Sequence, residues 1–405
     1  MARILFLTQV LPYPLSTGAR VRQYYVLRYL SQKHEVTLVS FVRADDQLEH
    51  VAHLKTFCQA VHYVPMIRSR WRDGRAAVKG LATGRPIVIV RDEIKSMQQL
   101  LTRLLASEHF DVIHADQVSM AQYGLLGKGP RRVLDLHNAM YLVTQRLADN
   151  EPNSIRRLVA QRETRALADY EARLCTQYDQ VVFVTEEDRR AIETQIVRLK
   201  LSIPPDRFTT VPICSDPSSK LPVKPAFHPH RVTALGVMFW PPNAEGVLWF
   251  AREAWPAIHA EFPEACLTIV GKNPPQSLLD LNGLENTEVT GYVPNLDQLL
   301  AETAAFIVPL RAGGGMRVKI LDTWCWGLPI VSTSIGAEGI LIRDGENILI
   351  ADSAETLSKA VQRILREPSL AQALRENGRR WVEEKYDWRQ VYASWDTVYT
   401  RMLDA

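Results

Sequence analysis

Long apolar runs are missing from this sequence of 405 residues. No stretch approaches the 18 or so uncharged apolar residues that a membrane-crossing helix needs, so we expect no transmembrane helix. The N-terminal segment has only a short apolar stretch and no small-residue cleavage site. We therefore expect a buried first strand there rather than a signal peptide.

Cysteine is scarce and shows no pairing pattern. The 5 cysteines are scattered, odd in number and include no CxxC pair. This scattered, odd-numbered set argues against a disulfide framework, and the lack of a CxxC pair argues against a structural zinc site, so we expect neither. The pattern is typical of a reducing compartment, and we expect the protein in the cytoplasm.

A strong excess of charge is also absent, but the charge is unevenly distributed. The net charge is +3; residues 1–222 carry 31 Lys and Arg against 23 Asp and Glu, whereas residues 223–405 carry 17 against 22. A basic half suggests an anionic partner, such as a phosphate, a membrane surface or a nucleic acid. Chance unevenness over two solvated surfaces explains the same counts.

What is present is an alternation of strands and helices in both halves of the chain. We predict strands at 4–8, 35–41, 61–64, 112–114, 132–136 and 180–184, and then at 232–235, 266–270, 288–290, 305–309 and 329–332. Helices are predicted at 21–30, 96–106, 155–175, 244–260, 296–301, 318–326, 354–366 and 370–385. This alternation predicts an α/β fold with two doubly wound, parallel sheets covered on both faces.

A proline-rich segment separates the two halves. Residues 214–230 hold four prolines and no hydrophobic periodicity, which indicates a linker. We predict one domain at 1–222, a second at 223–385, and a C-terminal helix with an aromatic face at 386–405. Ligands bind outside the carboxyl ends of parallel strands, so two such sheets facing each other predict a central cleft.

Three consecutive glycines follow a predicted strand of the second half. Gly313, Gly314 and Gly315 precede a helix whose first turn carries Arg317 and Lys319. Free N–H groups at a helix start attract anions, and two cations there oppose the helix dipole unless an anion is bound. A plain glycine turn is the alternative. Because the pattern is neither GxxxxGK[ST] nor GxGxxG, a P-loop NTPase and an NAD-linked dehydrogenase are disfavoured.

Asp322 lies one helical turn beyond Lys319 and on the same face. A carboxylate behind a phosphate site suits the diol of a ribose. The alternative is an ordinary ion pair between these two side chains.

The segment 309–340, PLRAGGGMRVKILDTWCWGLPIVSTSIGAEGI, resembles the donor-binding signature of GT-B glycosyltransferases of family 4. Further segments resemble this family in the same order along the chain: DVIHAD (111–116), LDLHN (134–138), DQVVFVTEEDRRAI (179–192), ALGVMFWPPNAEG (234–246), LTIVGKNP (267–274) and VTGYVPN (289–295). The N-terminal segment is similar to sugar transferases of exopolysaccharide gene clusters.

This resemblance implies two Rossmann-like domains and a retaining transfer of a sugar from a nucleotide-diphospho-sugar, built on UDP or GDP, to a glycan or lipid-linked acceptor. The expected setting is polysaccharide biosynthesis. The nucleotide-sugar is a substrate, and we expect no cofactor. We expect no metal either, because the chain has no DxD motif of the kind that holds metal in the other large transferase fold.

The resemblance also assigns roles to residues. Catalytic roles fall on His137, which would position the donor sugar, and on Arg317 and Lys319, which would stabilise the leaving diphosphate. The expected donor-binding residues are Gly18, Lys272, Tyr292, Val293, Gly313, Gly314, Gly315, Met316 and Asp322. His114 is the alternative to His137. Arg20 and Arg22, beside Gly18, are candidates for contact with the diphosphate; the alternative for them is a solvated, basic start of a helix.

One departure from the family pattern concerns its usual two glutamates, which are separated by seven residues. Aligned on this sequence, they fall on Gly314 and Asp322. Gly314 can offer a donor sugar only its backbone N–H, whereas Asp322 keeps a shorter carboxylate.

A basic segment in the first half suggests a membrane partner. Between Arg68 and Arg91, seven cations and Trp71 accompany one acid, Asp73. Basic residues around an aromatic ring suit an anionic membrane surface, which would place the protein at the inner membrane face; they equally suit a solvated loop. No nucleic-acid reader module matches, so we expect no nucleic-acid partner.

Two other functions fit the same fold. A nucleotide-sugar 2-epimerase would turn over its donor without an acceptor. A non-catalytic subunit would bind the nucleotide-sugar as a scaffold and transfer nothing.

Overall fold

The computed structural model describes residues 1–44, 46–149, 151–226 and 230–403, and the chain divides into two compact units. The first unit comprises Met1–Ile213 and Arg389–Ala405, and the second comprises Cys214–Trp388. The boundary thus precedes the one predicted at 222, because residues after 213 are bound within the second unit. Arg379, for example, donates to the carbonyl oxygens of Pro217 at 2.9 Å and Lys220 at 2.7 Å. Residues 227–229 of the predicted linker lie outside the described part.

The first unit is built on a parallel sheet with the strand order β3-β2-β1-β4-β5-β6-β7. Its strands are β1 (Arg3–Thr8), β2 (Glu35–Val42), β3 (Ala60–Pro65), β4 (Val112–Asp116), β5 (Arg131–Leu136), β6 (Gln180–Phe183) and β7 (Phe208–Thr210). The register places Phe6 of β1 between Leu38 and His114. A first strand in the middle of the sheet is the doubly wound arrangement.

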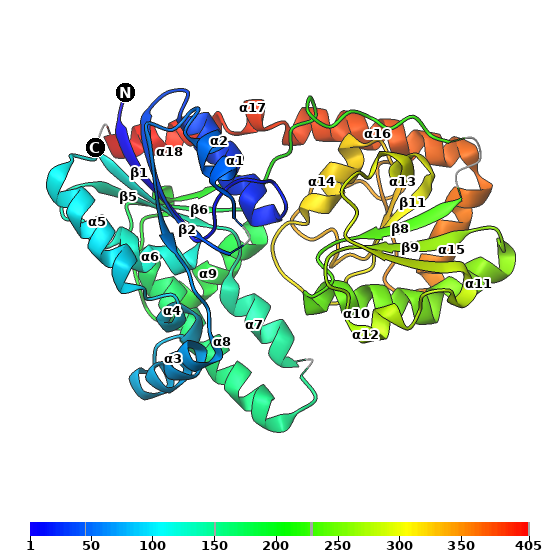
Figure 1. Cartoon of the computed structure of the whole chain (residues 1–405), viewed down its shortest axis with the longest axis horizontal. Helices are drawn as coiled ribbons and strands as arrows, with labels where there is room; N and C mark the ends of the chain where they lie inside the picture. The colour runs from blue at the N-terminus through cyan, green and yellow to red at the C-terminus, as the bar shows by residue number, and fades with distance from the viewer. Residues whose placement is uncertain (45, 150, 227–229, 404–405) are drawn as a thin grey trace. The chain divides into compact units, whose positions relative to one another are not determined.

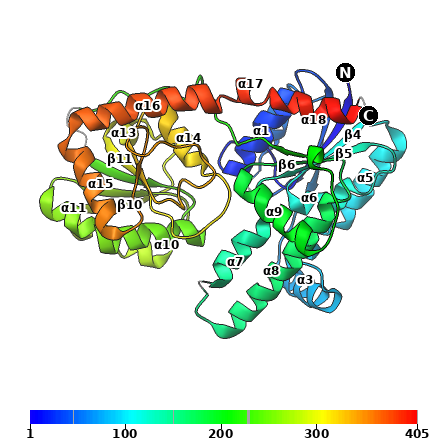
Figure 2. The same cartoon turned by 180° about the vertical axis from the view of Figure 1, so that it is seen from behind.

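Helices cover both faces of this sheet, and for that reason the strands read as continuous apolar runs. They are α1 (Gly18–Leu30), α2 (Leu48–Leu54), α3 (Arg70–Thr83), α4 (Ile87–Arg91), α5 (Lys95–Ser107), α6 (Val118–Gly124), α7 (Met140–Asp149), α8 (Ser154–Cys175) and α9 (Glu186–Arg198), with the 3₁₀ turn η1 (Pro205–Arg207). Seen from behind, α9 lies against the β6 side of the sheet (Figure 2). Helix α8 extends below the sheet with α3 beside it (Figure 1).

The last elements of the chain complete the first unit. Helix α17 (Trp388–Val391) leads into α18 (Ser394–Leu403). The aromatic face of α18 is buried, since Trp395 is 0% and Tyr399 is 1% exposed. Tyr399 lies over His114, with its hydroxyl 2.8 Å from Nδ1.

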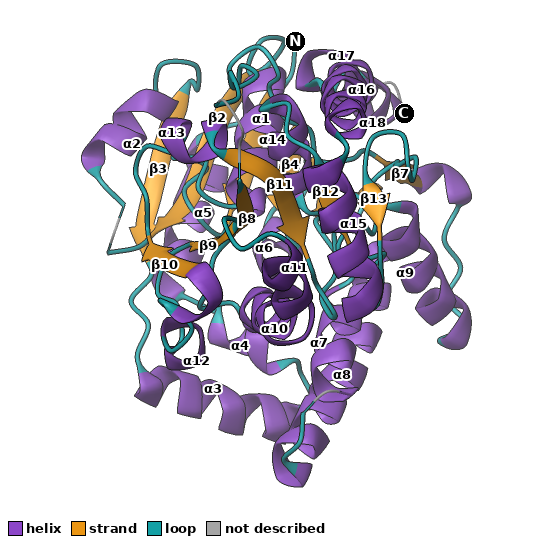
Figure 3. Cartoon of the chain, turned by 90° about the vertical axis from the view of Figure 1, so that its right-hand side faces the viewer, coloured by secondary structure: helices purple, strands orange, loops and turns teal. Residues whose placement is uncertain are grey.

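The second unit repeats the arrangement with the strand order β10-β9-β8-β11-β12-β13. Its strands, all parallel, are β8 (Arg231–Leu235), β9 (Cys266–Val270), β10 (Thr287–Gly291), β11 (Thr303–Val308), β12 (Ile330–Ser332) and β13 (Leu349–Ile350). Figure 3 draws the strands in orange and the helices around them in purple. The chain therefore folds as two Rossmann-like units, as predicted.

The helices of the second unit are α10 (Pro241–Trp249), α11 (Trp255–Glu261), α12 (Gln276–Leu279), α13 (Asp297–Ala301), α14 (Val318–Cys325), α15 (Ala354–Arg366) and α16 (Pro368–Tyr386), with η3 (Leu284–Asn286). A π-helical turn, η2 (Phe250–Ala254), interrupts the helix predicted over 244–260. Pro256 has no N–H to continue the α-helical ladder, and the Trp255 N–H bonds instead to the Phe250 carbonyl. Across the described residues, no helix combines the length and apolar character that crossing a membrane demands.

Candidate active site

The glycine loop of the second unit runs between β11 and α14 and is shaped around Arg317. Gly313 has φ 134° and Gly315 has φ 70°, a region that favours glycine. The Arg317 Nη1 donates to the carbonyl oxygens of Gly314 and Gly315. A Cβ on Gly313 would lie 2.8 Å from the Arg317 Nη2. The loop therefore needs glycine for its conformation and close packing, whatever it binds.

Lys319 lies in the first turn of α14 and is half-buried. Its Nζ donates to the Asn243 Oδ1 at 3.1 Å, a neutral partner. Burial, together with the neighbouring Arg317 guanidinium, lowers the pKa of Lys319 to about 7. Among the described residues, none of the ion pairs includes Lys319. A lysine with a neutral partner, close to a second cation at the start of a helix, forms a place where an anion would bind.

Asn243 links this lysine to the loop after β8. Asn243 does not cap the following helix, because α10 begins earlier, at Pro241. Its side-chain amide instead donates to the Val237 carbonyl at 3.0 Å and accepts from Lys319. Gly236 also packs closely against this lysine, because a Cβ on Gly236 would lie only 2.8 Å from the Lys319 Nζ.

Asp322 is held by residues at the start of the second unit. Its carboxylate pairs with Lys220, and its Oδ1 accepts from the Ser215 hydroxyl at 3.1 Å. The alternative of an ion pair with Lys319 is therefore wrong. The pairing with Lys220 was not accessible to sequence reasoning, because the two residues are 102 positions apart.

Lys272 and Tyr292 meet at the carboxyl ends of neighbouring strands. Lys272 follows β9 and Tyr292 follows β10, and the ammonium nitrogen lies 4.6 Å from the centre of the tyrosine ring. Tyr292 is 63% exposed and Val293 half-buried. A large, exposed ring at this edge of the sheet is a flat apolar surface against which a planar base can pack.

In the first unit, His137 follows β5 and is 8% exposed. Its Nε2 lies 2.8 Å from the Asp116 Oδ1, and its Nδ1 lies 3.3 Å from the Gln117 Nε2. The backbone just after His137 is fixed by buried carboxylates: Asp188 accepts from the Ala139 N–H at 2.7 Å, and Glu171 accepts from the Met140 N–H at 2.8 Å. Burial raises the pKa of Glu171 to about 8.

A fully buried ion pair lies behind His137. Arg22 donates to both oxygens of Asp135, at 2.7 and 2.9 Å, and to the carbonyls of Val211 and Pro212. Burial opposes ionisation of Asp135, but the Arg22 guanidinium outweighs it and leaves the pKa of Asp135 below its ordinary value. The pKa of the neighbouring Asp116 is instead raised by burial.

Sequence reasoning misjudged the arginines of the first helix. Arg22 is 0% exposed, and Arg20 is buried in an ion pair of 2.9 Å with Asp46. Neither side chain is therefore available to a diphosphate, contrary to the prediction. Gly18, in contrast, begins α1 directly after Thr17, whose side chain caps the helix.

The cluster also contains three groups of the kind that hold metals. Ligand atoms of Asp116, Asp135 and His137 lie within 4.8 Å of one another. Arg22 already brings a positive charge against Asp135, so the protein itself supplies the cation of this group. Asp116, Asp135 and Gln117 were missed as site residues, although DVIHAD and LDLHN contain the two aspartates.

His114 is a core residue rather than a second site histidine. It is fully buried, stacks on Phe6 with ring centres 4.2 Å apart, and contacts Tyr399. Burial lowers the pKa of His114 to about 3, which keeps the ring neutral. Its Nε2 has no hydrogen-bond partner among the described residues.

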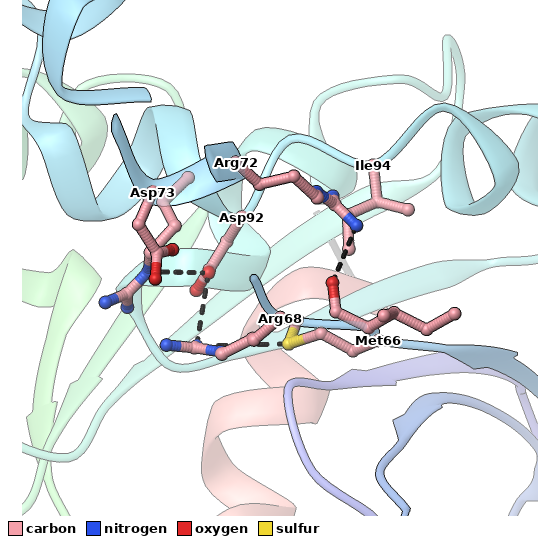
Figure 4. Close-up of a pocket in the computed structure, with 8 residues that line it drawn as sticks. Met66, Arg68, Arg72, Asp73, Asp92 and Ile94 are labelled. Atoms are coloured by element: carbon pink, nitrogen blue, oxygen red, sulfur yellow. Dashed lines mark hydrogen bonds and ion pairs between the residues drawn. The ribbon is translucent and has the colours of Figure 1, made fainter. Parts of the chain in front are cut away.

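The basic segment 68–91 lies mostly in helices α3 and α4, and four of its cations are neutralised by two acids. Arg68 pairs with Asp92 at 3.4 Å (Figure 4). Arg91 pairs with the same carboxylate at 3.2 Å. Lys79 and Arg85 pair with Glu93. These two acids lie immediately beyond the segment. The small pocket at the base of α3, about 10 Å³, is too small for a sugar.

Gln117 has an unusual backbone conformation beside His137. Its φ is 70° and its ψ is 155°, although it is not glycine. Such a conformation costs of the order of 1–3 kcal/mol and is concentrated at functional sites. The strain lies at the carboxyl end of β4, where a doubly wound sheet binds its ligands.

The chain is similar to known proteins in both sequence and structure. A family profile described as Glycosyltransferase Family 4 matches residues 16–219, and one described as Glycosyl transferases group 1 matches residues 229–367. An uncharacterized 44.6 kDa protein in the cps region of Klebsiella pneumoniae is 24% identical over 411 residues, covering 97% of this chain and 99% of the relative.

Two solved structures share the fold. Sucrose-phosphate synthase from Thermosynechococcus elongatus is 15% identical, with a TM-score of 0.71 over 99% of each chain. The HepE protein of Anabaena in complex with UDP-glucose is 13% identical, with a TM-score of 0.63 over 98% of this chain and 100% of that one.

Proposed function

The chain belongs to glycosyltransferase family 4, and from this premise we propose that it moves a sugar, with retention, from a nucleotide-diphospho-sugar to a glycan or lipid-linked acceptor. The expected nucleotide is UDP or GDP. The structural relative that binds UDP-glucose supports a nucleotide-sugar donor, and the relative from a cps region supports a role in polysaccharide biosynthesis.

One observation carries the proposal: Lys319, in the first turn of α14 and beside Arg317, has a neutral hydrogen-bond partner and takes part in none of the ion pairs of the described residues. When the bond between the sugar carbon and the diphosphate breaks, negative charge grows on the leaving phosphate oxygen. Donors already in place for that charge lower the barrier most. In this proposal no metal or organic cofactor takes part, because the two side chains supply the positive charge.

The remaining site residues have supporting roles in this proposal. Asp322 binds the ribose hydroxyls, Lys272, Tyr292 and Val293 enclose the base, and the glycine loop with Met316 lines the diphosphate. His137 positions the donor sugar, and Gly18 lets the backbone approach the donor. The acceptor hydroxyl gives its proton to the departing diphosphate, so no covalent carboxylate is required.

A nucleotide panel tests the donor site. We would measure thermal shifts with UDP, GDP, ADP, CDP and NAD on the wild type, on Lys319→Ala and on a control, Lys359→Ala, whose lysine is exposed on α15. One nucleoside diphosphate at about a hundred times its Kd should stabilise the wild type and the control by about 2.7 kcal/mol. It should stabilise Lys319→Ala much less.

Other outcomes of the panel separate the competing functions. A shift with NAD alone, or with nothing, contradicts the proposal. Binding followed by donor turnover without an acceptor indicates a 2-epimerase. Binding without any turnover, in the presence of a broad acceptor set, indicates a scaffold subunit.

The proposal includes contact with an anionic membrane at its cytoplasmic face through the segment from Arg68 to Arg91. The apolar side chains Trp71, Val78 and Leu81 are exposed by 69, 69 and 53%. Arg75 lies 4.8 Å from the Trp71 ring. Exposed apolar groups beside arginines are typical of helices that lie on membranes.

Vesicle sedimentation tests this surface. Vesicles containing phosphatidylglycerol should bind the wild type, and vesicles of phosphatidylcholine alone should bind it weakly. Arg75→Ala should weaken binding by about 1 kcal/mol, and Trp71→Ser should weaken it further. Equal binding to both vesicle types would contradict the electrostatic part of the proposal.

A further inference from the structure

The imidazole of His137 is bound on both of its edges. Its Nε2 lies 2.8 Å from the Asp116 Oδ1, and its Nδ1 lies 3.3 Å from the Gln117 Nε2. Because the ring is 8% exposed, its orientation is set by these two partners rather than by water. The question is which of the two nitrogens carries the hydrogen.

The hydrogen-bond partners of Asp116 determine which nitrogen of His137 carries the hydrogen. It is 0% exposed, and its second oxygen accepts a hydrogen bond of 2.5 Å from the Gln23 Nε2. An ionised carboxylate has no hydrogen to donate, so its 2.8 Å contact with Nε2 requires the hydrogen on the imidazole. His137 therefore donates through Nε2–H.

The other nitrogen of His137 is then an acceptor. Gln117 donates to it through its side-chain amide, which agrees with this tautomer. The Gln117 Oε1 is buried and has no hydrogen-bond partner among the described residues. In the free protein, the Nδ1 lone pair of His137 is therefore occupied by a neutral amide, and the Gln117 Oε1 is a second, unpartnered acceptor on the same side chain.

We propose that Asp116 is a positioning residue for His137, fixing the Nε2–H tautomer so that Nδ1 accepts a hydrogen bond from a sugar hydroxyl. The inference rests on the proposed function, which brings a sugar to His137. The Gln117 amide holds the place of that hydroxyl in the free protein. A lone pair at this point selects a hydroxyl over a phosphate oxygen, since an ionised phosphate has no hydrogen to donate.

The first test needs no substrate. Nitrogen-correlated NMR of histidine-labelled protein distinguishes the two neutral tautomers, and His137→Gln assigns the signal. The wild type should show Nε2–H at His137, and Asp116→Ala should shift it toward a mixture with Nδ1–H. His109, which pairs with Asp111 at 3.2 Å on the surface, is the internal control and should not change. An Nδ1–H tautomer in the wild type overturns the proposal, even if Asp116→Ala fails to fold.

The second test uses the conservative variant. In Asp116→Asn the amide oxygen can still accept from Nε2–H, because the Gln23 amide can turn and accept from the new NH₂ through its unpartnered Oε1. With UDP-glucose or GDP-mannose, whichever the nucleotide panel selects, Asp116→Ala should lower kcat about tenfold to a hundredfold. Asp116→Asn should stay within about threefold of the wild type in kcat, a rescue by tautomer rather than by charge.

The outcomes separate the two proposals. If both variants lose activity equally while the tautomer is unchanged, Asp116 acts through charge or stability and the inference is wrong. If no nucleotide-sugar is turned over by the wild type, the proposed function fails, and the tautomer result still decides whether Asp116 positions His137.

Discussion

The two units treat their charges in opposite ways at the carboxyl ends of their strands. In the first unit, Arg22 is matched by Asp135, and Asp116 is matched by hydrogen-bond donors from His137 and Gln23. In the second unit, Lys319 has a neutral amide as its partner, and Arg317 donates to loop carbonyls. A satisfied cluster fixes the position of a side chain, whereas an unneutralised cation such as Lys319 attracts a ligand.

The largest expected effect comes from breaking the matched pair. Arg22→Ala leaves a fully buried Asp135 without its cation, so it should destabilise the protein by about 3–5 kcal/mol in urea unfolding. Arg22→Lys keeps the charge but loses the bidentate geometry, so its stability should lie between that of the wild type and that of Arg22→Ala. Arg70→Ala, at the exposed start of α3, serves as the control and should change stability by less than about 0.5 kcal/mol. An Arg22→Ala protein as stable as the control would show that the cluster tolerates an unmatched charge.

A smaller effect is expected at Asp322, whose carboxylate is matched by Lys220 although it lies one helical turn from the unmatched Lys319. If it binds ribose, Asp322→Asn should weaken nucleotide binding by about 1.5–3 kcal/mol, measured by calorimetry. Binding of inorganic pyrophosphate, which has no ribose, should not change. Equal losses for both ligands, or a loss of stability alone, would make Asp322 a structural partner of Lys220.

The third prediction concerns pH and the unmatched lysine. Lys319 has a pKa of about 7 when no anion is bound, and its ordinary value is 10.5. Binding of a nucleotide-diphospho-sugar requires the protonated form, so affinity should fall as pH rises through about 7, by up to about 1.4 kcal/mol per unit. Lys319→Arg stays protonated and should flatten this dependence.

The lowered pKa of Lys319 also determines how the stability of the free protein changes with pH. Between about pH 7 and 10.5, the unfolded chain binds a proton at Lys319 that the folded chain does not, so the free protein should become more stable as pH rises through this window. Lys319→Met should remove that slope. A steeper affinity loss with pH in Lys319→Arg than in the wild type would contradict the assignment of this lysine.

The fold was largely predictable because a doubly wound sheet leaves a strong local signal. Buried strands such as Arg3–Thr8 are continuous apolar runs flanked by helices. The strands that escaped prediction, β7 and β13, have 3 and 2 residues, too few to form a pattern. The π-helical turn also escaped, because it depends on Pro256 within an otherwise regular helical pattern.

The site was predictable only where neighbours in sequence are neighbours in space. The glycine loop, Arg317 and Lys319 form one local motif and were found together. Arg22 and Asp135 are 113 positions apart, so nothing local revealed that the arginine is consumed by an ion pair. The charge of the basic segment is smaller than its own residues indicate, because the acids Asp92 and Glu93 follow it directly and pair with four of its cations.

The return of the chain to its first unit determines the order in which the protein can be completed during synthesis. Residues of α18 cover His114 and complete the first core, although that core begins at the first strand. The ribosome finishes the second unit at Trp388, before those covering residues exist. The first unit, although its synthesis begins first, therefore completes its core last, when Trp395 and Tyr399 of α18 are added. This reverses the usual rule that the N-terminal domain of a nascent chain folds first.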